Sequence, residues 1–111
     1  MQDSIPAIRR TEMADDQDRA YVRLAETALD DLFDKYASAT PAEKWNLKPA
    51  ITKAAESLLD ARLALFKEGT LVSPEDLVKL RDLKMEIDAA ANMQATILSA
   101  IKLAALLGAF A

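Results

Sequence analysis

Residues 73–111 read SPEDLVKLRDLKMEIDAAANMQATILSAIKLAALLGAFA, and the fold prediction depends most on this stretch. It begins with Ser73-Pro74, a pair typical of a helix start, in which serine caps the first turn and proline occupies the first helical position. No helix breaker follows before Gly108, so the pattern predicts one helix of about 34 residues, roughly 50 Å long. Its second half, residues 89–111, contains one charged side chain, and a helix that is apolar on every side needs cover.

A second helix is predicted before this stretch, from Lys48 or Pro49 to about residue 68, with Gly69 as its C-terminal cap. Its predicted buried face comprises Ile51, Ala54, Ala55, Leu58, Leu59, Leu65 and Phe66. Thr40-Pro41-Ala42-Glu43 is also typical of a helix start. Pro49 follows only eight residues after Pro41, and proline inside a helix removes a hydrogen bond. We therefore predict a short separate turn at residues 41–47, with Trp45 covering the end of a bundle.

A first helix is predicted from about Thr11, because apolar residues recur there at spacings of three and four. Before residue 20 this pattern thins, so the first turns are expected to project away from the core. Residues 1–10 show no periodicity and are predicted to form a flexible, extended arm. Residues 11–111 then form a single helical domain. The predicted buried stripe of the first helix comprises Tyr21, Leu24, Ala25, Ala28, Leu29, Leu32, Phe33 and Tyr36.

These segments together predict an all-α protein. The chain has 51% hydrophobic residues but only 2 Gly and 4 Pro, and runs of alternating apolar and polar residues are missing. We expect a three-helix up-down-up bundle or an extended helical hairpin with a long C-terminal helix. The short link at residues 69–72 predicts that the second and third helices are antiparallel neighbours.

The lengths of these helices predict an uncovered segment. A second helix of about 20 residues is roughly 30 Å long, so it covers the third helix only as far as about Gln94. Residues 95–111 would then need a protein partner, either another copy in a homo-oligomer or a different protein. The predicted interface comprises Ile97, Leu98, Ile101, Leu103, Leu106, Leu107 and Phe110.

The composition argues against several classes of function. The chain contains no His and no Cys, which removes the commonest metal ligands and the commonest acid–base group at neutral pH. Glu26, Asp30 and Asp34 share one helix face, which is typical of a solvated acidic surface. We predict no enzyme activity, no catalytic residue, no cofactor and no metal site. The net charge of −4 argues against nucleic-acid binding.

A membrane remains an alternative partner for the C-terminal segment. That segment is shorter than the ~20 residues of a spanning helix and is interrupted by Thr96, Ser99 and Lys102. Insertion into a bilayer is therefore less favoured than binding to protein. Residues 1–18 show no signal peptide, so the expected location is the cytoplasm, or the exterior after export by a non-classical route.

Residues 50–111 also resemble a known family. A helix ending in DARLALFKEGT, a turn containing proline and a long C-terminal helix resemble the needle and inner-rod subunits of type III secretion systems. The resemblance implies a helical hairpin that packs into a helical tube. This chain differs in its greater length, its acidic first helix and its GAFA ending. The positions that match are Pro74, Leu77, Leu80, Gln94, Ser99, Ile101 and Lys102.

The predicted function is that of a structural or interaction protein, such as a subunit of a secretion-type assembly. A fainter resemblance is to small helical quorum-sensing antiactivators, whose apolar C-terminal helix dimerises. It implies the alternative of a small regulatory protein that sequesters a protein partner.

Overall fold

A computed structural model describes residues 4–67, 69 and 71–110, with side chains described from Asp16 onward. Four helices account for most of these residues: α1 (Ser4–Ala37), α2 (Pro41–Phe66), α3 (Pro74–Ala89) and α4 (Met93–Gly108). This part of the chain contains no strand, which confirms the predicted all-α class. The predicted number of three helices is wrong, because residues 74–108 form two helices instead of one.

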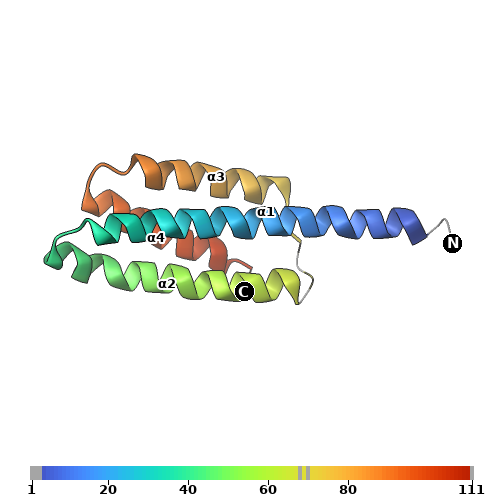
Figure 1. Ribbon diagram of the computed structural model, residues 1–111, viewed down its shortest axis with the longest axis horizontal. Helices are drawn as coiled ribbons and strands as arrows, with labels where there is room; N and C mark the ends of the chain where they lie inside the picture. Colours follow the sequence, from blue (N-terminus) through green and yellow to red (C-terminus); the bar gives the residue numbers. More distant parts are fainter. Residues whose placement is uncertain (1–3, 68, 70, 111) are drawn as a thin grey trace.

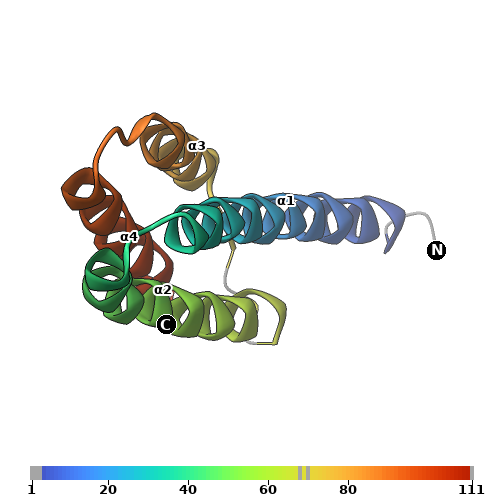
Figure 2. The ribbon, with the colours of Figure 1, turned by 60° about the vertical axis from the view of Figure 1, so that its left-hand side comes forward.

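The four helices form a bundle in which successive helices run in opposite directions (Figure 1). Around the bundle the order is α1, α2, α4, α3, since α2 and α3 each pack on both α1 and α4 (Figure 2). Within the described residues, α2 and α3 do not pack on each other. The prediction that they are neighbours is therefore wrong. The chain between them crosses the end of the bundle to reach the far side (Figure 1).

The predicted long C-terminal helix is interrupted between α3 and α4. Ala90 has extended backbone angles (φ −61°, ψ 115°), and the Lys35 Nζ donates a hydrogen bond to its carbonyl oxygen at 3.1 Å. Asn92 caps α4 by accepting a hydrogen bond from the Ala95 N–H at 2.8 Å. Because the chain reverses here, the apolar segment folds back onto α2.

α2 is continuous through Pro49, contrary to the predicted break before it. The predicted capping signature at Thr40 is present, but it starts α2 itself and not a separate turn. The Thr40 N–H donates to Glu43 Oε1 at 2.9 Å, and the Glu43 N–H donates to Thr40 Oγ1 at 3.2 Å. Proline lacks the N–H that would bond to the carbonyl one turn earlier. The burial of Leu47 and Ile51 on either side of Pro49 offsets that loss and holds the helix together.

α1 begins at Ser4, so the predicted extended arm is wrong from Ser4 onward, while residues 1–3 lie outside the described residues. The first turns of α1 extend well beyond the end of the bundle, as the thinning apolar pattern predicts (Figure 1). This projection contributes to the elongated dimensions of 62 × 22 × 19 Å.

The core draws large side chains from all four helices, whereas small residues let α2 and α4 approach closely. Ala50 and Ser57 of α2 lie beside Ala104 and Gly108 of α4. A Cβ atom added to Gly108 would lie 3.9 Å from the Ser57 Oγ, an ordinary contact distance. α2 and α4 therefore form the most extensive helix pair of the bundle. The largest fully buried apolar side chains are Tyr21, Leu32, Leu47, Leu80, Ile87, Leu103 and Leu107.

Candidate protein-interaction surface

The seven C-terminal residues predicted as an interface divide between the core and the surface. Leu103 and Leu107 are fully buried, Ile97, Leu106 and Phe110 are half-buried against the core, and Leu98 and Ile101 are 50% and 52% exposed. The prediction that residues 95–111 have no cover within the chain is therefore wrong. α4 folds back on α2, so most of the apolar surface of α4 belongs to the core.

The C-terminal end of the chain is attached to α1 by aromatic packing. The Phe110 ring packs edge-on against Tyr21, with the ring centroids 5.1 Å apart. One turn earlier, the buried Asp18 carboxylate accepts a hydrogen bond from the Val72 N–H at 3.0 Å. Burial raises the pKa of Tyr21, and the negative charge of Asp76 raises it further. These contacts join α1, the chain before α3 and the C-terminal end, and we assign them to stability.

A lysine links α1 and α3 at the rim of the bundle. The Lys84 Nζ lies 3.2 Å from Asp31 and 2.8 Å from Asp88. The nearby Asp88 carboxyl group, together with burial, raises the pKa of Asp31, whereas Asp31 and Lys84 lower the pKa of Asp88. Hydrogen bonds to both aspartates raise the pKa of Lys84. The site is a surface ion-pair network, whose members contribute little individually.

The described residues offer no grouping typical of a metal site or a spanning helix. In the part of the chain with described side chains, no three acidic residues gather closely enough to hold a metal ion. The four helices described also lack the combination of length and apolar character needed to cross a membrane. The large exposed apolar side chains are most numerous on α2.

α2 carries apolar side chains on two opposite faces. When Pro49 is assigned position a of a heptad, the residues of the inner face fall at positions b, c and f. Every residue there from Leu47 to Leu65 is buried. Positions a and d, at alternating spacings of four and three, lie on the opposite face. These a and d residues, all of them exposed, form what we call the outer stripe: Trp45, Pro49, Thr52, Glu56, Leu59, Leu63 and Phe66.

The outer stripe exposes unusually large side chains. Trp45 is 80% exposed, which contradicts the prediction that it covers the end of the bundle. Leu59, Leu63 and Phe66 are also among the large hydrophobic side chains that are about half exposed or more. Single exposed apolar residues are ordinary. Leu59, Leu63 and Phe66, however, occupy three successive positions of the outer stripe, and exposed apolar patches are candidates for binding surfaces.

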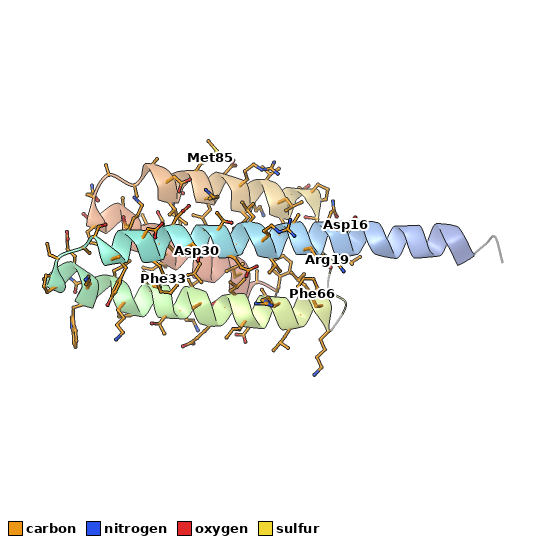
Figure 3. All side chains as sticks on the ribbon, viewed as in Figure 1. Asp16, Arg19, Asp30, Phe33, Phe66 and Met85 are labelled. Carbon is orange, nitrogen blue, oxygen red and sulfur yellow. The ribbon has the colours of Figure 1, made fainter. Side chains whose placement is uncertain are left out.

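Shallow apolar grooves flank the outer stripe on both sides. On the side of α1, Phe33 and Tyr36 line a groove with Ile51 and Ala55 of α2. Figure 3 shows Phe33 on the side of α1 that faces α2 and Phe66 near the C-terminal end of α2. On the other side, Ile101 and Ala105 of α4 line a second groove with Lys53 and Asp60. α2 is thus a ridge between two grooves, a shape that suits packing against another helix.

The a and d spacing of the outer stripe is visible in the sequence, yet the sequence-based prediction did not identify these residues as an exposed surface. The prediction placed Leu59 and Phe66 on the buried face of the second helix, and both are exposed. The prediction was correct for Ile51, Leu58 and Leu65, which are buried. Both faces of α2 are apolar, so periodicity does not distinguish the inner one from the outer one. The signal in the sequence that indicates the outer stripe is a second heptad stripe on the same helix.

Comparisons with protein-family models, curated protein sequences and solved structures find no significant match to this chain. The resemblance to type III secretion subunits therefore stays a prediction. The function has to be argued from the geometry of the surface.

Proposed function

We propose that this protein is a non-enzymatic helical interaction module that binds a helix of another protein molecule along the outer stripe of α2. The supporting observation is that every a and d position from Trp45 to Phe66 is exposed, over three heptads. Four of these seven positions carry large apolar side chains, whereas Thr52 and Glu56 are polar. Apolar residues at a and d are typical of a helix that packs on another helix.

The free energy of burial supports the same proposal. Fully burying an exposed large apolar side chain contributes roughly 1.5–3 kcal/mol. The outer stripe presents Leu59, Leu63 and Phe66, about half exposed, at successive positions, and Trp45 nearer the start of α2. Leaving them in water serves no purpose in the fold, since the inner face of α2 already supplies its share of the core. α4 offers only Leu98 and Ile101 as large exposed residues. The proposed interface therefore lies on α2 and not on residues 95–111.

Photo-crosslinking tests this proposal. A photoreactive phenylalanine analogue replaces Leu63 of the outer stripe, or Val78 of α3 or Leu98 of α4 as controls of similar exposure. We expect an adduct of defined mass from position 63 in cells that produce the protein, with little or none from positions 78 and 98. An adduct from position 98 alone would favour the C-terminal helix instead. Equal labelling at all three positions would contradict a specific surface.

A further inference from the structure

The outer stripe fits a second copy of itself, an inference that rests on the proposed function and specifies its partner. We propose that two chains associate through their α2 helices in antiparallel orientation. Three features favour this arrangement: the order of apolar residues along the outer stripe, the charges beside it, and the symmetry of the resulting pair.

The apolar residues are complementary in the antiparallel register. In an antiparallel helix pair, each a position faces a d position of the other helix. One register places Pro49 opposite Phe66, Thr52 opposite Leu63, and Glu56 opposite Leu59, with each pair formed twice. Every pair then contains at least one large apolar side chain that is exposed in the single chain. Glu56 opposite Leu59 is the weakest pair, because a charged side chain faces an apolar one. Position 56 is therefore where a substitution can strengthen the association.

The charges that border the outer stripe favour this orientation over the parallel one. In a parallel pair, g positions face e positions of the other helix, which would bring Lys48 to Lys53 and Arg62 to Lys67. In the antiparallel register, e positions face e positions, so Lys53 meets Asp60 twice. Both residues are exposed beside the groove between α2 and α4. The facing e and g positions bring no like charges together, and the parallel alternative is disfavoured.

The two-fold symmetry of the pair limits the assembly to two chains. A two-fold axis uses the same surface on both chains, so the outer stripes are covered without a third copy. Trp45 lies one helical turn beyond Pro49, and so past Phe66 of the second copy, at the end of its α2.

Sedimentation equilibrium of the full chain across the micromolar range tests the proposal. We expect a mass of twice the 12.1 kDa of one chain, which should fall toward the mass of one chain on dilution. K53E and D60K should each weaken association about tenfold, because two attractive pairs become repulsive. The double variant K53E/D60K should recover the association of the unmodified protein. E56L should strengthen it.

A charge reversal on α3, D82K, serves as the control and should leave the mass unchanged. L63E should give single chains with unchanged helical circular dichroism. A mass of 12.1 kDa throughout the range would overturn the proposal, as would a double variant no better than its two parents. If the chain is monomeric but position 63 still gives an adduct of another mass, the proposed function stands and the second copy is wrong. If position 63 gives no adduct either, both fail.

Discussion

At the scale of single residues, Tyr21 shows how burial changes the chemistry of a side chain. It is fully buried in the core, and no described group accepts a hydrogen bond from its hydroxyl. Burial and the charge of Asp76 raise its pKa above the ordinary value of 10.0. The folded protein therefore holds the phenolic proton more tightly than the unfolded chain does. By linkage, this contribution to stability is complete below pH 10 and is lost as the pH rises above it.

An alkaline titration of the Y36F variant, in which Tyr21 is the only tyrosine, tests this shift. We expect no tyrosinate absorbance near pH 10, and then its appearance together with the loss of helical circular dichroism. The physical reason is that Tyr21 ionises readily only after the core opens. The expectation fails if the absorbance develops smoothly around pH 10 while the helical signal stays constant.

At the scale of helices, capping defines where α2, α3 and α4 begin. Ser73 and Asp76 form a reciprocal pair of hydrogen bonds at the start of α3, as Thr40 and Glu43 do for α2. Both starts were predicted because serine or threonine followed by proline is a strong local signal. The cap of α4 by Asn92 was missed, because alanines precede it and no proline follows.

The N92A variant tests whether that cap maintains the reversal between α3 and α4. We expect its free energy of unfolding in urea to fall by about 1 kcal/mol, because the Ala95 N–H loses its acceptor. N92S is the matched control and should retain most of the stability, since serine is also a good cap. Equal stability of N92A and the unmodified protein would show that the cap is dispensable.

At the scale of the whole molecule, the position of α4 is the main departure from expectation. The predicted overhang of residues 95–111 does not exist, because the break at Ala90–Asn92 returns the chain to α2. This return of the chain stabilises the fold, because it buries Leu103 and Leu107 against the other helices. This arrangement buries part of the predicted interface and leaves Leu98 and Ile101 exposed, whereas α2 carries four exposed large apolar side chains.

Two leucine truncations on α4 test this arrangement. L107A should lower the free energy of unfolding by about 2–5 kcal/mol, because it leaves a cavity in the core. L98A changes the same residue type at a half-exposed position and should change stability by less than about 1 kcal/mol. Chemical denaturation followed by circular dichroism measures both. Similar losses in the two variants would contradict the packing of α4 described above.

Much of the fold can be predicted from local patterns. The two apolar faces of α2 are also visible in the sequence, but which of them stays exposed is not. Tyr21, Leu29 and Leu32 were placed on a buried stripe of the first helix and are buried there. Phe33 was placed on the same stripe but is 47% exposed, at the edge facing α2. Local spacing identifies an apolar face, but it does not show how far a neighbouring helix covers that face.

The amino-acid sequence alone accounts for the all-α class, the capped starts of α2 and α3, and the absence of His and Cys. These properties depend on backbone preferences and side-chain chemistry within a few residues. The return of α4 and the choice between the two apolar faces of α2 come from tertiary packing. Leu58 and Leu59 are adjacent and chemically identical, yet one is buried and the other is 61% exposed. The difference arises because burial depends on contacts among four helices, which are distant along the chain.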